Sequence, residues 1–567
     1  MQPYHTEAVQ VETNTPSLPR TAPLLLTLAW LAAVVLVGPA GDFALGDDWA
    51  YAWAAKSLCE NGRLDLLPWA APSLLAHAAW GALVCLAGGF SFELLRLGTL
   101  LFAASGLLAF HLLLARCSSS SRSGSRAPAA RNSALLATAT LAFSPLYFGL
   151  SFTFMTEIPC LALCLWAALL YLRGLQDDKP GSLLAAAAVM VVAVLMRQNV
   201  LLLAVAATAT AWRFPPGRLT RVAAAARCLL LPLASVVAYY AWLLNWQGAP
   251  AGAAIRLSDI ASASPLRVAD VALRAWLTLG LLAAPMVIRN SLSRDRLLRI
   301  GLPAGLLLTV AACLFASRTG AGFALPNLLH AGGTGALTLR DTLFLGMASP
   351  FDGSTAARTA ISAASVLLAT LLFVRLLPTR LSLREALDTP ARCLLSLAAA
   401  LLLGGSLLQA DFYFDRYLLP ALPFVLALLA MADNDSQRRT PATGLSLALL
   451  AAMTFYSVAG SHDYMQWNRA RHQLLGELET RGVAATEIDG GVEYNGWRLA
   501  PLERSWPTIE EATPGRSPEK KSWWWVEDDR WVVSFTALEG YRVADRRQWQ
   551  RWLPPSAGEV LLLERER

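Results

Sequence analysis

Residues 22–64 read APLLLTLAWLAAVVLVGPAGDFALGDDWAYAWAAKSLCENGRL and contain a long apolar run followed by two adjacent acids. The apolar part, Ala22–Ala40, is long enough to cross a hydrocarbon core of roughly 30 Å as a helix. Asp47 and Asp48 follow at the place where the chain should reach water. We therefore expect a membrane-spanning helix here, with two carboxylates held close to the membrane surface.

The composition agrees with a membrane protein. Of the 567 residues, 55% are hydrophobic and 15% are charged, and the mean hydropathy is +0.45, whereas soluble domains carry about 25% charged residues. Apolar runs of similar length recur up to Gly460, and they are rich in Leu and Ala without the alternation of membrane-barrel strands. The sequence predicts an all-α polytopic membrane protein.

The first apolar run has two interpretations. Gly38–Ala40 is small enough for a signal-peptide cleavage site. Against this, the basic charge before the run is weak, since Arg20 is offset by Glu7 and Glu12, and about a dozen further apolar segments follow. We expect an uncleaved anchor that leaves residues 1–21 as a cytoplasmic tail.

Arginine-rich loops indicate the orientation of the helices, because basic residues concentrate in cytoplasmic loops. An even number of crossings must separate such loops, so the segment Ala70–Gly89 is expected to dip into the membrane without crossing it. The result is about thirteen spans in the cytoplasmic (inner) membrane, with the N-terminus inside the cell and the C-terminus outside. The arginine-rich loops are 115–132, 213–227, 289–299, 375–392 and 432–441.

The net charge of +7 does not indicate nucleic-acid binding, because the basic residues are scattered through the inter-helical loops and form no basic face. Most of the eight cysteines lie in or beside apolar segments, and none shows zinc-ligand spacing. We expect no nucleic-acid partner, no disulfides and no structural zinc.

The chain divides into a multi-span membrane domain, residues 22–460, and a soluble part, residues 461–567. The soluble part is charged and mixes a helix-like stretch, 467–482, with strand-like runs at 530–538 and 558–565. We expect a small extracytoplasmic α+β domain.

Three successive tryptophans, Trp523–Trp525, belong to this expected domain. Exposed indole rings there could stack on sugars, while core packing of a small β-rich domain explains them equally well. Both interpretations stay open. The domain is expected to cover the active site or to help select acceptors.

Asp47 and Asp48 lie in the first external loop, which we take as residues 42–93. The segment after them has one apolar face, so it would form a short helix along the membrane surface and hold both acids at a fixed depth. The alternative is that the two acids only end a helix at the interface, where charge costs little.

Glu157 begins another apolar segment on the same predicted side of the membrane. Thr156 could cap this helix, Pro159 fits its first turn, and an acid at a helix N-terminus offsets the helix dipole. A helix cap and an active-site acid are both open interpretations of Glu157.

Two arginines depart from the orientation rule. Arg197 lies in VLMRQNVLLL, and Arg416 lies beside Tyr417 in DFYFDRYLLPALP, both on the predicted external side. An ionisable group near the membrane needs a partner and is a candidate functional residue. The alternative for Arg416 is a structural ion pair with Asp415.

These acids and arginines together suit the transfer of a sugar from a lipid phosphate. A carboxylate can take the proton of an acceptor hydroxyl as that hydroxyl attacks the anomeric carbon. Arginines can bind the phosphate and stabilise the charge that grows on it. The lipid tail would stay in the bilayer, which gives a reason for the many spans.

The motifs resemble those of the GT-C superfamily of polyprenyl-phosphate-sugar glycosyltransferases, especially the branch of protein O-mannosyltransferases and lipid A aminoarabinose transferases. The acid pair with WAYAWAAKSLCENGRL resembles the first external loop of that branch, and TEIP resembles its second acidic motif with Glu in place of Asp. RQN and RYLLPALP resemble its basic elements. The Pro-Pro element of the first loop is reduced to LPWAAPSLLAH, where His77 and Pro72 are stand-ins.

The resemblance implies a role for each matching residue. Asp47 would be the general base, Asp48 would orient it or the acceptor, and Glu157 would help to place the acceptor or the sugar. An inverting outcome is also implied. The donor phosphate would be bound by Arg197 and Arg416, with Tyr417 nearby.

The resemblance also bears on cofactors and partners. Three external acids could hold a divalent cation, but two arginines already supply positive charge and the branch is not thought to need a metal, so we expect none. The expected partners are a polyprenyl-phosphate sugar donor and a lipid, polysaccharide or protein acceptor. The alternative function is a transporter or flippase of lipid-linked sugars, which predicts ionisable groups near the bilayer midplane and paired repeats.

Overall fold

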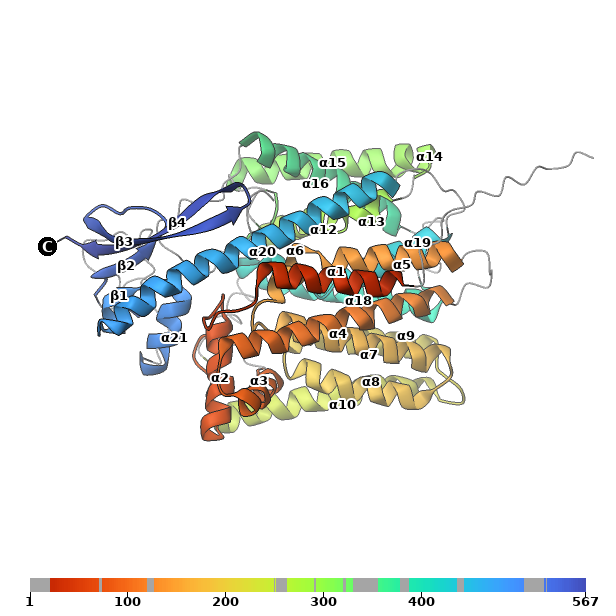
Figure 1. Cartoon of the computed structure of the whole chain (residues 1–567). Helices are drawn as coiled ribbons and strands as arrows, with labels where there is room; N and C mark the ends of the chain where they lie inside the picture. Colours follow the sequence, from red (N-terminus) through yellow and green to blue (C-terminus); the bar gives the residue numbers. More distant parts are fainter. Residues whose placement is uncertain are drawn as a thin grey trace, which may run out of the picture.

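The computed structural model is mostly helical and has a small sheet near its C-terminus (Figure 1). The predicted tail up to residue 20, Pro72, Trp523 and Trp524 lie outside the residues that the structure describes. The described residues are 21–70, 74–119, 127–248, 250, 263–289, 292–319, 323–329, 355–377, 387–435, 443–503, 525–526 and 528–566.

Seven helical segments of the described residues are long and apolar enough to cross a membrane, and four apolar helices are shorter. This confirms a polytopic helical membrane protein, while the count of about thirteen spans stays a prediction. The seven are α4 (Phe92–Ser119), α7 (Glu157–Gln176), α10 (Arg221–Trp242) with η3 (Leu243–Gln247), α14 (Arg294–Arg296) with η4 (Leu297–Gly301) and α15 (Leu302–Thr319), α16 (Thr355–Leu376), α18 (Pro390–Ser406) and α20 (Thr443–Thr480). The shorter ones are α1 (Ala22–Val37), α3 (Leu75–Gly88), α8 (Pro180–Val194) and α19 (Leu422–Asp435).

Local chemistry explains where several helices begin. The Thr389 hydroxyl accepts a hydrogen bond from the backbone N–H of Arg392 at 3.3 Å, and Pro390 opens α18. Proline lacks an N–H that the first turn would leave unbonded, and the hydroxyl satisfies another. Ser264 caps α12 (Pro265–Leu282) in the same way.

The first loop folds at one end of the helix bundle. α2 (Asp48–Asn61) and α3 lie there, at the end from which the C-terminal sheet also projects (Figure 1). The predicted surface helix is therefore present, but its environment differs from the prediction. Trp49, Ala52 and Ala55 are fully buried, because α3 and α21 (Val492–Glu503) both pack on α2.

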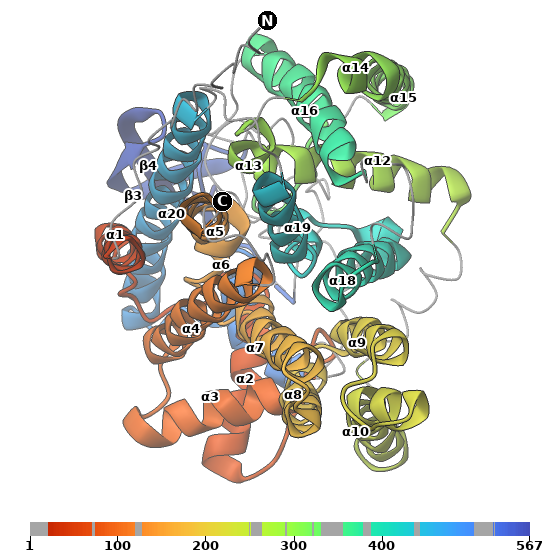
Figure 2. The same cartoon turned by 90° about the vertical axis from the view of Figure 1, so that its right-hand side faces the viewer.

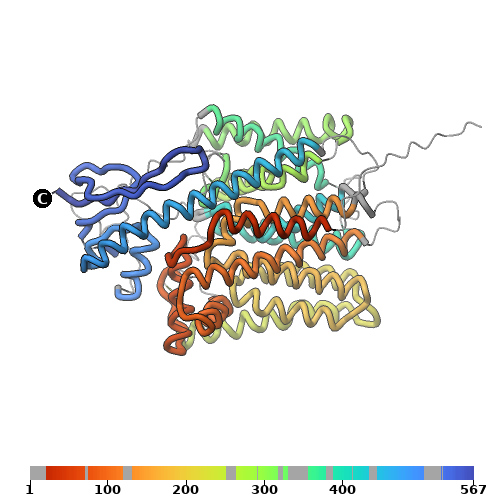
Figure 3. The backbone as a smooth tube through the Cα atoms, viewed as in Figure 1, coloured from red at the N-terminus to blue at the C-terminus, as the bar shows by residue number. Residues whose placement is uncertain are grey.

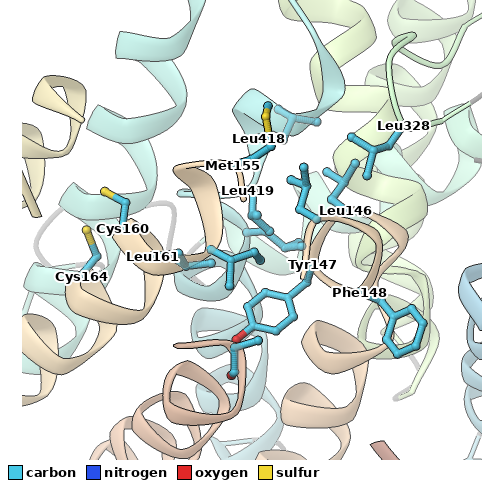
Figure 4. Packing of buried hydrophobic residues seen from close by; sticks show 14 of the residues in the cluster. Leu146, Tyr147, Phe148, Met155, Cys160, Leu161, Cys164, Leu328, Leu418 and Leu419 are labelled. Atoms are coloured by element: carbon cyan, nitrogen blue, oxygen red, sulfur yellow. The ribbon is translucent and has the colours of Figure 1, made fainter. Parts of the chain in front are cut away.

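α7 lies between α4 and α8 and packs on both of them (Figure 2). A short helix, α6 (Pro145–Leu150), precedes α7 and packs in the core, where Leu146, Tyr147 and Phe148 lie near Leu161 and Leu419 (Figure 4). The Tyr147 hydroxyl donates to the carbonyl of Ala103 in α4 at 2.6 Å. The turn between α6 and α7 is thus held against the first spans. The remaining helical elements are α5 (Ala127–Ala142), α9 (Leu201–Arg213), α13 (Ala284–Ile288), η2 (Gln198–Val200), η5 (Leu407–Phe412), η6 (Asp415–Leu418) and η7 (Ala485–Glu487).

The C-terminal sheet has four strands in the order β1-β2-β4-β3. Its strands are β1 (Ile488–Asp489), β2 (Trp531–Ser534), β3 (Tyr541–Trp552) and β4 (Pro555–Arg565). β1 pairs with β2 in parallel, and β4 pairs antiparallel with both β2 and β3. The strand-like runs seen in the sequence form β2 and β4, which agrees with the predicted small sheet-containing part.

α20 connects the bundle to this sheet as one continuous helix of 38 residues (Figure 3). The proposed boundary between residues 460 and 461 falls inside it. Asp463 of α20 accepts the backbone N–H groups of Trp552 and Leu553, both at 2.8 Å. The sheet is therefore attached to the helix by hydrogen bonds as well as by the chain.

Candidate functional site

Asp47 lies at the N-cap position of α2, but its side chain does not cap the helix. Its Oδ2 accepts a hydrogen bond from Nη2 of Arg416 at 2.8 Å, and its Oδ1 accepts from the indole N–H of Trp69, also at 2.8 Å. The whole residue is 8% exposed. Asp47 therefore faces other segments of the bundle and does more than end a helix.

Asp48 has a different set of partners. Its two oxygens accept the backbone N–H groups of Leu45 at 2.7 Å and of Phe154 at 3.1 Å. Burial raises the pKa of Asp48 to about 8, and these two backbone hydrogen bonds act in the opposite direction. Asp48 thus joins the first loop to the turn before α7.

Glu157 is the first residue of α7, and its Oε1 lies 2.5 Å from Nη1 of Arg197. Thr156 does not cap this helix with its side chain, contrary to the prediction. Its hydroxyl accepts a hydrogen bond from the same Arg197 nitrogen at 3.1 Å. The arginine competes successfully for the hydroxyl because a charged donor forms the stronger hydrogen bond.

Arg416 joins the two acidic segments. Besides its hydrogen bond to Asp47, its Nε lies 3.5 Å from Oε1 of Glu157. Its Nη1 also donates to the side-chain oxygen of Asn327 at 3.3 Å. The side chain of Arg416 is 6% exposed, so both carboxylates contribute to the neutralisation of a buried charge.

Tyr417 lies beside both arginines. Its ring centre is 5.7 Å from the guanidinium carbon of Arg416 and 5.9 Å from that of Arg197. Asp415, the predicted alternative partner of Arg416, accepts the backbone N–H groups of Leu328 and Leu329. The predicted basic and acidic residues therefore meet in one cluster, which we call the carboxylate–arginine cluster: Asp47, Arg416, Glu157 and Arg197 with Tyr417.

Arg96 shapes the chain that leads to Asp47. It is 1% exposed and donates to the carbonyls of Pro39, Gly41 and Phe43 at 2.6, 2.9 and 3.0 Å. Its Nε donates to the carbonyl of Phe152 at 2.7 Å. These four hydrogen bonds from one buried guanidinium hold the start of the first loop against the turn before α7.

The C-terminal part reaches the same loop. The backbone N–H of Gly46, directly before Asp47, donates to Oε1 of Glu493 at 3.3 Å. Glu493 also pairs with Arg471 at 3.1 Å, and both side chains are fully buried. Gly46 has a φ of 61°, which glycine adopts without steric cost. Trp525 packs edge-to-face on Trp49 of α2, with ring centres 5.6 Å apart.

Several contributors to the site carry no recognisable sequence motif. Trp69 and Asn327 hydrogen-bond to the cluster through side chains that are common at membrane interfaces and in loops. His77 is fully buried and bonds to the carbonyl of Phe154 at 3.1 Å, so it supports the turn that holds Asp48. In the sequence, His77 appears only as a stand-in within the reduced motif LPWAAPSLLAH, which does not predict this hydrogen bond.

The chemistry of the cluster follows from its charges. Two carboxylates alternate with two guanidinium groups, and Oε2 of Glu157 has no hydrogen-bond partner among the described residues. Such a cluster can accept a proton at a carboxylate and bind an anion at the arginines. Within the described ranges, no group of three or more His, Cys, Asp or Glu side chains is arranged to hold a metal ion, and metal independence stays a prediction.

Comparison with known proteins bears on the class of this chain. Residues 126–243 match the family model described as dolichyl-phosphate-mannose-protein mannosyltransferase. This segment, roughly a fifth of the chain, contains Glu157 and Arg197. The match confirms, for this segment, the resemblance to GT-C membrane glycosyltransferases predicted from the sequence motifs. No curated protein matches the chain.

Solved structures give weaker likenesses. ArnT from Cupriavidus metallidurans in the apo state is 14% identical with a TM-score of 0.29, over 73% of this chain and 77% of that one. The same enzyme bound to undecaprenyl phosphate is 14% identical with a TM-score of 0.31, over 77% and 78%. The arabinosyltransferase EmbB from Mycobacterium smegmatis is 13% identical with a TM-score of 0.33, over 80% of this chain and 42% of EmbB.

Proposed function

We propose that this chain is a membrane glycosyltransferase that moves a sugar from a polyprenyl-phosphate donor to an acceptor on the outer face of the cytoplasmic membrane. The observation that carries the proposal is the buried carboxylate–arginine cluster, whose members come from four separate segments of the chain. The acceptor is a lipid, a polysaccharide or a protein, and the N-terminus lies in the cytoplasm. The predicted division into residues 22–460 and 461–567 belongs to the same proposal.

Asp47 is the proposed general base. Its carboxylate takes the proton of the acceptor hydroxyl, the hydroxyl oxygen forms a bond to the anomeric carbon, and the bond from that carbon to the phosphate oxygen breaks. Attack from the side opposite the phosphate inverts the anomeric centre. Polyprenyl phosphate leaves with the bonding electrons, and its new charge is stabilised by arginine.

Arg416 and Arg197 are the proposed phosphate ligands, with Tyr417 beside them. In the structure, Arg416 is bound to Asp47 at 2.8 Å, and a donor phosphate would compete for the same guanidinium. When Arg416 turns to the phosphate, the carboxylate of Asp47 loses this hydrogen bond and is free to contact the acceptor hydroxyl. Donor binding would thus prepare the base.

Asp48 and Glu157 are assigned supporting roles. Both oxygens of Asp48 are used by backbone N–H groups, which supports a role in positioning Asp47 over direct contact with substrate. Glu157 holds both arginines through Oε1, and its unpartnered Oε2 is available to an acceptor or sugar hydroxyl.

The test uses purified full-length protein with synthetic prenyl-phosphate sugars and a cell-envelope extract as the acceptor source. We expect release of prenyl phosphate and transfer of the sugar, both lost in Asp47→Asn. The flippase alternative predicts that intact donor moves across sealed vesicles without cleavage. Cleavage-free movement that is unaffected by Asp47→Asn would reject the enzyme proposal.

A further inference from the structure

A cavity of about 790 Å³ lies beside the C-terminal half of α2 and outside the carboxylate–arginine cluster. Its walls come from α2, from the segment that follows it, and from the end of α10 with η3. The polar, charged and aromatic side chains that line it are those of Ser57, Asn61, Arg63, Asp65, Trp242 and Gln247.

The walls of this cavity are fixed by hydrogen bonds. Gln247 donates through Nε2 to the carbonyl of Leu64 at 2.8 Å, which joins η3 to the segment after α2. Asp65 accepts the indole N–H of Trp53 at 3.0 Å. Trp53 in turn packs edge-to-face on Trp497 of α21, with ring centres 5.9 Å apart. Specific side-chain contacts therefore hold the walls of this cavity in place.

Three of the lining side chains keep hydrogen-bonding groups that nothing in the described part of the chain uses. Ser57, Asn61 and Arg63 have no hydrogen-bond or ion-pair partner there, and Ser57 is nevertheless 8% exposed. Ser57 and Asn61 are one helical turn apart on the same face of α2. Their hydroxyl and amide groups therefore face the cavity together.

The chemistry of the cavity fits a sugar. Trp242 lines the cavity, and an indole ring can stack on a sugar ring. A hydroxyl, a primary amide, a carboxylate and a guanidinium can together donate hydrogen bonds to sugar hydroxyls and accept hydrogen bonds from them. Arg63 and Asp65 carry opposite charges, so the lining does not favour an anion. A phosphate would meet the negative charge of Asp65.

We propose that this cavity binds a neutral saccharide, the remote sugar residues of the acceptor. Ser57 follows Asp48 by nine residues of one helix, which corresponds to about 14 Å along its axis. A site at that distance would hold sugar residues other than the one that accepts the transfer. The saccharide binding rests on the cavity alone, and its assignment to the acceptor rests on the proposed function.

The experiment measures binding of neutral trisaccharides, namely mannotriose, maltotriose and galactotriose, to the purified full chain by saturation-transfer NMR. We expect at least one to bind, and we expect Trp242→Ala and Asn61→Ala each to weaken that binding roughly two- to tenfold. Trp246→Ala is the matched control, because Trp246 is 76% exposed on η3 and does not line the cavity.

Three outcomes would overturn the proposal. The first is no binding of any of the three trisaccharides, and the second is binding that both cavity variants leave unchanged. The third is binding of inorganic phosphate alone that is lost in Arg63→Gln, which would assign the cavity to an anionic headgroup. Trisaccharide binding and sugar transfer, both measured on the wild-type chain, separate the two proposals. Trisaccharide binding without any sugar transfer would leave the saccharide site standing and reject the proposed enzyme.

Discussion

Arg416 donates a hydrogen bond to Asp47 over 2.8 Å, although 369 residues separate them in the chain. The same guanidinium lies 3.5 Å from Glu157, so one buried cation joins the first loop to the start of α7. A pair closed over such a separation costs chain entropy. Substitutions of Asp47, Glu157 or Arg416 should therefore affect both the buried cluster and the proposed sugar transfer.

The first prediction concerns Asp47→Asn. Because the amide keeps an oxygen for the Trp69 N–H but cannot accept a proton, transfer should fall about 10²–10⁴-fold while the protein still inserts and folds. Sugar transfer and thermal unfolding in detergent are the two measurements. Asp295→Asn makes the same chemical change at a residue 82% exposed and should leave both unchanged. Full transfer in Asp47→Asn would remove this residue from the mechanism.

The second prediction concerns the buried pair of Glu157 and Arg197. Glu157→Gln leaves two guanidinium groups without their shared carboxylate, and the loss of one partner of a buried pair costs about 3–5 kcal/mol of unfolding free energy. The double variant with Arg197→Gln should lose less than the sum of the two single variants, which a double-mutant cycle in denaturant measures. Strict additivity would mean that the two side chains do not interact in solution.

Much of this cluster could be anticipated from the sequence. In the sequence, Asp47 and Glu157 stand out as acids at the predicted external ends of apolar segments. Arg197 and Arg416 stand out because they depart from the orientation rule on that same side. The structure brings all four together. Motif order and loop charge carry that information even when each motif alone is short.

The partners could not be anticipated in the same way. Asp48 and Asp415 bind backbone N–H groups of distant segments, and backbone groups leave no mark on composition. α2 is buried by α3 and by α21, and α21 lies more than 400 residues later in the chain. The amphipathic pattern alone therefore predicts a helix along the membrane surface and not a buried one. Tertiary contacts of this kind override local periodicity.

The third prediction is a pH dependence caused by Asp48. Its pKa is about 8 in the folded protein, against about 4 for an ordinary aspartate. The folded state therefore binds the Asp48 proton more tightly than the unfolded state does, and this difference stabilises the fold. This contribution to the unfolding free energy is complete below about pH 4 and is lost as the pH rises through about 8. Unfolding free energy measured across this range should fall less steeply in Asp48→Asn than in the wild type. Identical slopes would contradict burial as the dominant influence on this carboxyl group.

The fourth prediction concerns the shape of the cation at position 416. Arg416→Lys keeps the charge but not the fork that reaches Asp47, Glu157 and Asn327 together. Loss of one or two charge-assisted hydrogen bonds to the donor phosphate should weaken donor use on the order of ten- to a hundredfold. The change should appear as a raised KM for the prenyl-phosphate sugar. Arg299→Lys, at an 82% exposed site, is the control, and an unchanged KM in Arg416→Lys would place the phosphate elsewhere.

The last prediction tests whether the C-terminal part positions Asp47. Glu493 accepts the Gly46 N–H and pairs with Arg471 in a fully buried site, so Glu493→Gln weakens both contacts without touching the cluster. Because the loop before Asp47 would then be less well fixed, kcat should fall while KM for the donor changes little. Glu539→Gln removes an exposed carboxylate of the same part of the chain and serves as the control. Equal kcat values for the two variants would show that the loop is held by Arg96 and the helices alone.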